Sequence, residues 1–433
     1  MPRLRWTMIV LCFVATTINY VDRATMSVAA PFIQRDLHLG PAVMGTLMGA
    51  FFWTYAAMQV PGGWLVDRLG ARLVYALAVG WWSAFTAATA LVQGAGAIFG
   101  LRFALGIGEA GSYPTNAKVA SLWFPRSERG IASAIFDSGS RTGSALSLPI
   151  VAALVGLLGW RLAFVCTGLL GLVWVVVWLA LYRDPDRHRA VSPESLAALR
   201  AAQPKAPDGP AVPWRSLFRY RTVWGMMLGF FCLNFSFYFF TTWFPTYLMQ
   251  ARGFSLAQLG TVGMLPALAA IPAGLCGGLA SDALYRRGWS LTVARKSCIA
   301  GGLLASSVIV LSSFVTSTVA ALLLFTLCYS SLAFAGANIW ALPGDVAPSQ
   351  DHVASLGGIQ NGAANLAGIA ISTFTGVMLQ ITHGSFVVPL CVAGGFCVLG
   401  AATYLFVVGP LAPLPSLPPR AGRTARTAPA GRA

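Results

Sequence analysis

The feature that most constrains this chain is a series of apolar stretches, each long enough to cross a lipid bilayer as one helix. The first runs from Trp6 to Ile33 and is almost entirely apolar or small, and about 20 such residues span the hydrocarbon core. The chain is 57% hydrophobic and only 10% charged, whereas soluble domains carry roughly 25% charged residues. Because the runs are continuous rather than alternating, they predict membrane helices and not a β-barrel. The first run is also too long for a cleavable secretory signal.

The apolar pattern divides into two sets of six predicted spans, so we expect an all-α membrane protein with 12 transmembrane helices in two six-helix halves. The predicted spans are 6–33, 42–66, 71–91, 96–121, 131–156, 161–182, 222–249, 257–280, 297–315, 318–344, 353–380 and 386–409. We expect an N-terminal half at 1–182, a cytoplasmic linker at 183–221 and a C-terminal half at 222–409. The Pro-, Ala- and Arg-rich tail at 410–433 is predicted to be disordered.

The basic residues predict the orientation of these spans. With the N-terminus inside, 22 of the 29 Lys and Arg residues fall on the cytoplasmic side and 4 within spans, and only Arg35, Arg161 and Arg252 are external. This is a positive-inside distribution, which predicts an inner-membrane protein with both termini in the cytoplasm. The net charge of +16 therefore reflects topology, and no nucleic-acid partner is expected.

A short internal repeat supports the division into halves. GWLVDRLGARL begins at Gly63 and GLASDALYRRG begins at Gly278, and each places an Asp four residues after Gly, with basic residues following. Repeated six-span halves are typical of secondary transporters, whose substrate site lies between the halves. We therefore expect gating loops that hold the halves in one state and release them in the other, formed by Gly63, Asp67, Arg68, Arg72 and Asp282.

Enzyme chemistry has no support in the sequence. The eight cysteines are scattered singly without metal-binding spacing, and the four histidines all fall in predicted loops. No zincin or nucleophile-elbow motif is present. We expect no metal, no cofactor, no disulfide and no catalytic activity.

Strongly ionisable residues within the predicted spans are confined to the first half, apart from Asp345 at a span end. They are Asp22, Arg23, Arg102, Glu109, Lys118, Asp137 and Arg141. Each unpaired charge costs about 2.5–3.5 kcal/mol at the centre of a bilayer, so these groups must pair or face a watery cavity. Lys118, close to the cytoplasmic end of its span, can extend to the interface and is interpreted as structural.

Four of these charges are predicted to form one cluster. Arg102 and Glu109 lie on one face of their helix but about 10 Å apart along it, so we expect each to meet a partner from the first span. There Arg23 can hold a carboxylate through a bidentate contact, while Asp22 competes for Arg23 until it is protonated. Protonating either acid leaves an excess positive charge that attracts an anionic substrate, which would couple anion binding to proton uptake.

The loop PGGWLVDRLGAR (Pro61–Arg72) resembles the signature loop of the major facilitator superfamily. The segments INYVDRATMSVAAP, FFWTYAAMQVPGGWLVDR, LRFALGIGEAGSYPTNAKVASLWFPRSERGIAS and TTWFPTYLMQARGFS are together similar to its anion:cation symporters, which take up sugar acids such as galactonate, glucarate and hexuronates with protons. The resemblance covers essentially all twelve spans. It implies that Asp22 and Glu109 are protonation sites, that Arg23 holds the substrate carboxylate and that Arg102 is the partner of Glu109. It also places the hydroxyls of Tyr20 and Tyr55 at the substrate.

The second half offers neutral amides and aromatic rings instead of charges. Its polar candidates are Asn234, Tyr238, Asn338, Trp340, Gln360, Asn361 and Asn365. Amides suit a polyhydroxylated substrate, but the same groups can simply join helices. We assign Asn361 and Trp340 to the substrate site and leave both interpretations open for the others. The aromatic run FFCLNFSFYFFTTWF is expected to serve mostly in packing, with part of it lining an outer gate.

One segment departs from the resemblance. In IFDSGSRTGSAL, Asp137 precedes Arg141 by four residues, whereas the symporters usually have a neutral amide at the first position and no arginine at the second. The spacing favours an intrahelical ion pair. Alternatively, Arg141 faces the cavity and binds a second carboxylate, which would favour a dicarboxylate substrate.

Together these features predict a monomeric, proton-coupled importer of an organic anion, a sugar acid in particular, that works by alternating access. An importer of an aromatic or other dicarboxylate is one alternative. A proton-coupled exporter of the same fold is another, although the fifth span lacks the Gly-Pro-rich motif that such exporters usually carry.

Overall fold

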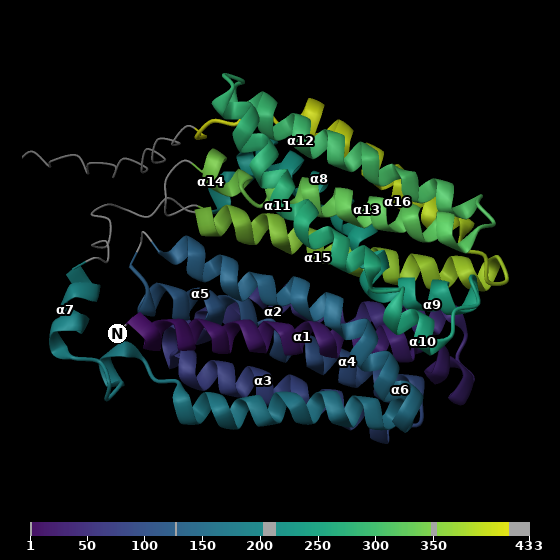
Figure 1. Cartoon of the computed structure of the whole chain (residues 1–433), viewed down its shortest axis with the longest axis horizontal. Helices are drawn as coiled ribbons and strands as arrows, with labels where there is room; N and C mark the ends of the chain where they lie inside the picture. Colours follow the sequence, from purple (N-terminus) through teal and green to yellow (C-terminus); the bar gives the residue numbers. More distant parts are fainter. Residues whose placement is uncertain (1, 126–127, 202–213, 348–352, 415–433) are drawn as a thin grey trace, which may run out of the picture.

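The computed structural model describes residues 2–125, 128–201, 214–347 and 353–414 of the 433-residue chain. Within those residues all regular elements are helical. Figure 1 shows two groups of long helices lying side by side, one built from the first half of the chain and one from the second.

The first group holds α1 to α6. Its elements are α1 (Pro2–Asp36), α2 (Pro41–Leu69), α3 (Ala71–Ala88), the 3-10 turn η1 (Thr89–Leu91), α4 (Ala95–Glu109), α5 (Ser112–Trp123) and α6 (Arg129–Leu181). The helix α6 is in fact two helices, because Gly159 has φ 80° and ψ 164° in its middle. Only glycine adopts such a backbone without strain, and the chain reverses direction there (Figure 1).

The second group holds α8 to α16. Its elements are α8 (Arg221–Thr242), α9 (Phe244–Gln250), α10 (Leu256–Thr261), α11 (Leu265–Arg286), α12 (Leu291–Ser306), the 3-10 turn η4 (Ser307–Ser313), α13 (Thr318–Ile339), α14 (Leu342–Val346), α15 (Val353–Ile381), α16 (Val387–Ala402) and the π-helical turn η6 (Thr403–Val407). Between the two groups lie η2 (Pro185–Arg187), the short helix α7 (Pro193–Ala201) and η3 (Trp214–Arg219).

The helix lengths and apolarity agree with membrane passes. By length and composition, nine helical segments of the described residues can cross a bilayer. One of them, Ile131–Leu181, contains both parts of α6 and so accounts for two passes. The helix α2 and the consecutive helices α4 and α5 run through the same bundle and complete twelve. The chain is an all-α, multi-pass membrane protein, as its apolar pattern predicts, although α4/α5, α8/α9 and α13/α14 each break within a predicted span. Most of the predicted tail lies outside the described residues.

The bundle has two ends, which differ in how closely the two groups of helices approach. The near end carries the first residues of α1, and the far end carries the loop at 37–40 between α1 and α2. At the far end the groups approach closely: a Cβ on Gly45 of α2 would lie 2.4 Å from the carbonyl oxygen of Ser372, and one on Gly376 of α15 would lie 2.4 Å from that of Pro41. Glycine at both positions is what lets α2 and α15 touch there.

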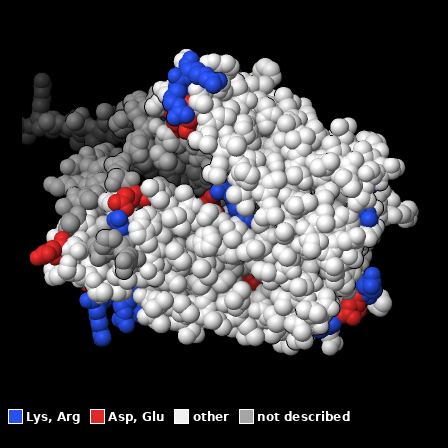
Figure 2. All heavy atoms as spheres, viewed as in Figure 1, with Lys and Arg blue, Asp and Glu red and all other residues white. Residues whose placement is uncertain are grey.

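At three glycines in the near half of α15 no such close approach is found among the described residues. A Cβ added to Gly357, Gly358 or Gly362 would meet no atom within 4 Å. In Figure 2 the broad surface of the molecule is largely free of charge, and a few basic and acidic atoms are visible in the seam between the two groups. The groups are therefore closed against each other at the far end and more open toward the near end.

Candidate functional site

The centre of the site is an ion pair between α1 and α4. The Nε–H of Arg23 donates to Oε2 of Glu109 at 2.6 Å. The Glu109 side chain is 0% exposed, whereas Arg23 keeps 15% of its side-chain surface accessible. A buried arginine–carboxylate pair is stable only when its geometry is good, and removing one partner leaves a costly buried charge. Arg23 therefore connects a wholly buried acid to an accessible surface.

Aromatic rings surround the Arg23 guanidinium. Its Cζ lies 4.6 Å from the centroid of the Tyr55 ring, 4.7 Å from that of Phe51 and 5.3 Å from that of Tyr20. Cations are attracted to ring faces at such distances. These rings fix the position of the guanidinium. Tyr20 and Tyr55, whose hydroxyls were predicted to reach the substrate, therefore lie at Arg23, and their contact with a substrate remains a prediction.

Arg102 does not form the pair with Glu109 that the resemblance implies, whereas the spacing of the two residues predicts a partner from the first span for Glu109. It is 5% exposed, it lies 5.4 Å from the Phe51 ring, and its Nε has no hydrogen-bond partner among the described residues. The ion pair of Glu109 is with Arg23 instead. Arg102 thus adds a buried positive charge beside the Arg23–Glu109 pair.

Asp22 lies apart from Arg23 despite being its neighbour in sequence. It is 2% exposed, and neither carboxyl oxygen has a hydrogen-bond partner in the described part of the chain. Trp82 of α3 and Thr167 of α6 lie near it. Consecutive residues of a helix point about 100° apart, which explains why Asp22 turns into the first group of helices while Arg23 turns toward the second. The expected competition between Asp22 and a substrate for Arg23 is not present in this conformation.

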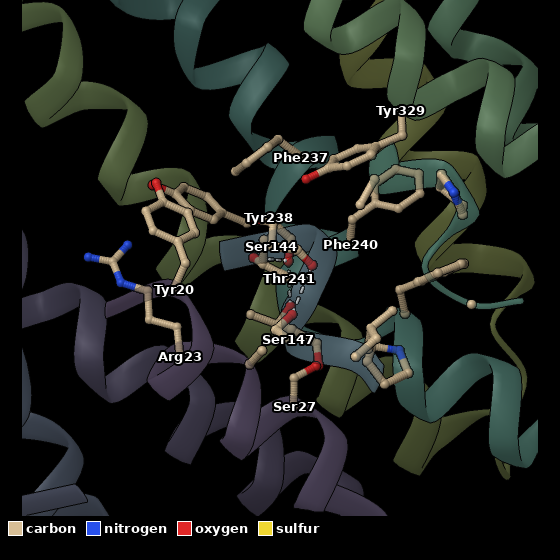
Figure 3. Close-up of a pocket in the computed structure, with 18 of the residues that line it drawn as sticks. Tyr20, Arg23, Ser27, Ser144, Ser147, Phe237, Tyr238, Phe240, Thr241 and Tyr329 are labelled. Atoms are coloured by element: carbon tan, nitrogen blue, oxygen red, sulfur yellow. Dashed lines mark hydrogen bonds between the residues drawn. The ribbon is translucent and has the colours of Figure 1, made fainter. Parts of the chain in front are cut away.

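A pocket lies between the two groups of helices, with Arg23 and Arg102 in its wall. Figure 3 shows Arg23 and Tyr20 on one side and Phe240 and Tyr329 on the other, with serine and threonine hydroxyls between them. Its hydroxyl residues are Ser27, Ser144, Ser147, Thr241 and Thr242, and its rings are Tyr20, Phe51, Phe52, Phe237, Tyr238, Phe240, Phe244 and Tyr329. The pocket thus combines a positive pole with aromatic walls and scattered hydroxyls.

The far side of this pocket is closed by contacts between the groups. The Ser27 hydroxyl donates to the carbonyl oxygen of Thr242 at 2.7 Å, and the Phe52 and Tyr238 rings meet at 4.6 Å. The aromatic run on α8, predicted to serve mostly in packing, contributes several pocket walls and part of this closure.

The amides of the second half are used largely to hold helices together. Asn338 donates to the carbonyl oxygen of Gly277 at 2.9 Å, Gln360 donates to that of Ile339 at 3.3 Å, and Asn234 donates within its own helix. The Asn365 amide accepts from the Tyr238 hydroxyl at 2.9 Å. For these groups the structural alternative fits the geometry better.

Asn361 and Trp340, the two residues of the second half that were assigned to the substrate, do not belong to the pocket lining. Asn361 is partly exposed, and Trp340 is 54% exposed and packs edge-on against Phe230. Their assignment remains a prediction.

Comparison with known proteins identifies the family. A family model described as "Major Facilitator Superfamily" matches residues 12–373. The chain belongs to the Major Facilitator Superfamily. Among curated relatives, a probable galactarate/D-glucarate transporter of Bacillus subtilis is 35% identical over 94% of this chain and 92% of its own. One of Escherichia coli K12 is 36% identical, with 94% and 95% covered. A D-galactonate transporter of Escherichia coli O6:H1 is 33% identical, with 94% and 96% covered.

Solved structures show the same fold. A bacterial homologue of the human lysosomal transporter Spinster, in an inward-facing and occupied conformation, matches with a TM-score of 0.75. It is 21% identical and covers 93% of this chain and 96% of that one. Its inward-facing, unoccupied form matches with a TM-score of 0.73. As a member of the superfamily, the protein is a multi-pass membrane transporter and not an enzyme.

The superfamily signature loop forms an ion pair that the sequence did not reveal. Asp67, at the end of α2, accepts from Nζ of Lys118 on α5 at 2.8 Å. Lys118 was interpreted as a side chain reaching the interface, yet it is the partner of Asp67, the residue predicted to belong to the gating loop. Arg72 instead donates to the carbonyl oxygen of Leu179, and Arg68 lies 5.2 Å from the Trp64 ring. Gly63 lies against Pro114 of α5.

The matching loop of the second half is organised by Arg295, which sequence reasoning missed. Its guanidinium lies 3.4 Å from Asp282 and 3.3 Å from Asp345, and it donates to the Ser281 hydroxyl at 2.7 Å and to the Asn338 amide oxygen at 3.2 Å. The signal was available in the acidic residue at each helix end, which requires a cationic partner nearby. Which basic residue supplies it depends on helix packing.

Proposed function

We propose that this protein is a proton-coupled symporter that imports an organic anion, a sugar acid in particular, across the cell inner membrane by alternating access. The observation that carries the proposal is Arg23: a guanidinium in the wall of the pocket, held by a wholly buried acid. The names of the relatives, which are transporters of galactarate, D-glucarate and D-galactonate, support a sugar acid as the substrate.

Arg23 supplies the binding step. A guanidinium can hold a carboxylate through two parallel hydrogen bonds. Arg23 now donates through Nε to Glu109, and a substrate carboxylate that enters the pocket competes with Glu109 for it. The rings of Tyr20, Phe51 and Tyr55 hold the guanidinium in place during this exchange.

Glu109 supplies the coupling to protons. When its carboxyl is protonated, it no longer attracts Arg23 as an ion, and the substrate carboxylate replaces it. When the substrate leaves, Arg23 and ionised Glu109 pair again. An unpaired buried charge is costly. The protein therefore favours binding the proton and the anion together and releasing them together.

Asp22 is the second proton site in this proposal. Its carboxyl has no partner among the described residues, and a buried carboxylate without hydrogen bonds is costly, so the neutral carboxyl suits this conformation. Asp22 is also near enough to Glu109 for their negative charges to repel. A proton on Asp22 would remove this repulsion.

The orientation of the helices is compatible with import. The positive-inside distribution places the near end in the cytoplasm, so the conformation described here is open toward the cytoplasm and closed toward the outside. An importer releases its substrate from such a state. Both termini are then cytoplasmic.

Uptake in proteoliposomes tests the proposal. The purified protein receives an inward proton gradient and a panel of radiolabelled anions: galactarate, glucarate, galactonate, glucuronate, tartrate and phthalate. We expect gradient-driven accumulation of at least one sugar acid, abolished by a protonophore. Glu128→Gln serves as a control for Glu109→Gln, because Glu128 pairs with Arg5 away from the pocket.

Two outcomes would contradict the proposal. If no anion accumulates in the wild-type vesicles under the gradient, the protein is not an importer of this class. If instead preloaded anion leaves the vesicles faster while protons flow into them, the exporter alternative is supported.

A further inference from the structure

A second arginine–carboxylate pair lies beside the pocket, on α6. Nη2 of Arg141 is 3.4 Å from Oδ2 of Asp137, one helical turn away. The two side chains are 44% and 43% exposed, in contrast to the buried Arg23–Glu109 pair. A single long contact between half-exposed groups is weak, so another carboxylate can replace Asp137 on Arg141.

The spacing along α6 places Arg141 on the helix face that meets the pocket, although Arg141 is not itself among the lining residues. Ser144 and Leu148, which line the pocket, follow Arg141 by three and seven residues and so share its helix face. Between them, Gly143 packs against Tyr20: a Cβ there would lie 2.7 Å from the Tyr20 Cβ. Tyr20 also contacts the Arg23 guanidinium, so one side chain packs against both the Arg141 segment of α6 and Arg23.

The surroundings of the pair are tyrosines rather than further charges. The Tyr113 hydroxyl donates to Oδ1 of Asp137 at 3.5 Å. Tyr20 lies within electrostatic range of Asp137, and Tyr329, from the second group of helices, lies within range of Arg141. Both Tyr20 and Tyr329 line the pocket. In the described residues, Asp137 is the sole ion-pair partner of Arg141.

We propose that Arg141 is the anchor for a second substrate carboxylate and that Asp137 is the counter-ion which this carboxylate displaces. The substrate is then a dicarboxylate, held by Arg23 at one end and by Arg141 at the other, with its middle against the hydroxyls and rings of the pocket. The inference rests on the proposed function and specifies the substrate class for that same site.

The charge balance of the site favours a diacid. Its charged groups are Arg23, Arg102, Arg141, Glu109 and Asp137. With Asp22 neutral and Glu109 protonated, these groups sum to three positive charges and one negative charge. A bound dianion brings the sum to zero, whereas a monoanion leaves one uncompensated positive charge in a low-dielectric site.

The test compares two acids that differ only at one end. Galactarate has a carboxylate at C6 where galactonate has a CH2OH group, so the pair isolates the second anchor. KM for both is measured in proteoliposomes with the wild-type protein, Arg141→Gln, Arg141→Lys and Asp137→Asn. Arg161→Gln is the control, because Arg161 pairs with Asp36 at the far end. Size-exclusion profiles and thermal midpoints establish that each variant folds.

We expect the wild type to prefer galactarate. Arg141→Gln should raise KM for galactarate roughly ten- to hundredfold, the effect of losing a charge-assisted hydrogen bond, and leave KM for galactonate within about twofold. Arg141→Lys should retain part of the preference, and Asp137→Asn should keep or strengthen it, because Arg141 loses its competitor.

Two results would overturn the inference while leaving the proposed function intact. In one, Arg141→Gln raises KM for galactarate and galactonate equally, which would mean that Arg141 is only structural. In the other, the wild type prefers galactonate and Arg141→Gln leaves that preference unchanged. If the wild type accumulates no organic anion at all, the proposed function fails, and this inference fails with it.

Discussion

Arg23 of α1 donates its Nε–H to Glu109 of α4 at 2.6 Å, and this contact joins the wall of the pocket to an acid that is completely buried. The two residues are 86 positions apart in the chain. Removing one member of such a pair typically costs about 3–5 kcal/mol. A cycle in which a substrate carboxylate takes the place of Glu109, while a proton neutralises it, avoids that cost at each step.

Glu109→Gln imitates the protonated acid permanently. We predict that the variant still exchanges labelled for unlabelled substrate across the membrane, because Arg23 stays free to bind. It should lose gradient-driven accumulation by at least about tenfold, because no proton is exchanged at this position. Counterflow and uptake assays on the same vesicles measure the two activities. Undiminished accumulation by Glu109→Gln would remove Glu109 from the coupling mechanism.

Arg23→Lys retains the positive charge but loses the planar fork of the guanidinium. We predict a rise in KM of roughly ten- to hundredfold, because a bidentate carboxylate contact becomes a single one. Arg252→Lys is an informative comparison, since Arg252 also contacts a tyrosine ring, Tyr247, but away from the pocket. Equal effects of both substitutions on KM would mean that Arg23 acts through stability and not through the substrate.

Asp22→Asn tests the second proton site. Neither oxygen of Asp22 has a hydrogen-bond partner among the described residues, so the substitution by an amide breaks no hydrogen bond there. The thermal midpoint should stay within about 2 °C of the wild type. Uptake should lose its dependence on the proton gradient. The control is Asp184→Asn, whose carboxylate accepts from the Tyr182 hydroxyl outside the pocket; an Asp22 variant as pH-dependent as this control would exclude Asp22 from coupling.

The fold could be predicted almost completely from the sequence, because each membrane span requires a long run of apolar residues. The reversal at Gly159 falls between two predicted spans, 131–156 and 161–182. Local breaks within spans were not predicted: α4 ends at Glu109 and α5 begins at Ser112 inside one predicted span, and α8 ends at Thr242 just before α9 inside another. Both features depend on backbone geometry that hydropathy does not record.

The candidate site could be predicted only in part. Arg23 and Glu109 could be predicted as site residues, because a charged side chain inside the membrane is costly and usually has a function. The spacing of Arg102 and Glu109 along one helix correctly predicted that Glu109 pairs with a residue of the first span, whereas the family resemblance favoured Arg102. What the sequence could not supply is the rotation of each helix about its axis. The same limit applies to Asp22, which points away from Arg23, and to the amides of the second half, whose partners are backbone carbonyls on adjacent turns or helices.

Gly376→Ala should disturb the closed far end. The added methyl would lie 2.4 Å from the carbonyl oxygen of Pro41, and overpacking of this kind costs about 1–3 kcal/mol. We predict a shift toward a conformation open at the far end. Spin labels replace the exposed residues His38 and His383 in a background without the eight native cysteines. Double electron–electron resonance should then report a longer distance between the labels than in the protein with Gly376.

Gly358→Ala is the matched control for this experiment, because a Cβ on Gly358 meets no atom within 4 Å. Its distance distribution should equal that of the wild type. If Gly376→Ala also leaves the distance distribution unchanged, the close approach of α2 and α15 does not determine which end is open.

The two near-end ion pairs should differ in their contribution to stability. Arg295 is 15% exposed and contacts Asp282, Asp345, Ser281 and Asn338. Arg295→Ala should therefore destabilise the protein by about 3–5 kcal/mol. Lys118→Ala breaks a pair whose side chains are 34% and 72% exposed and should cost at most about 1 kcal/mol. Thermal unfolding in detergent compares them, and a larger loss for Lys118→Ala would contradict the comparison.

Simultaneous measurement of proton and substrate movement tests the central claim most directly. Vesicles that contain the protein and a trapped pH indicator receive galactarate or galactonate from outside, with no imposed gradient and with the membrane potential clamped. We predict that the lumen acidifies as the labelled anion enters, and that Glu109→Gln admits the anion by exchange without acidification. Entry of the anion into wild-type vesicles with no movement of protons would contradict proton-coupled symport.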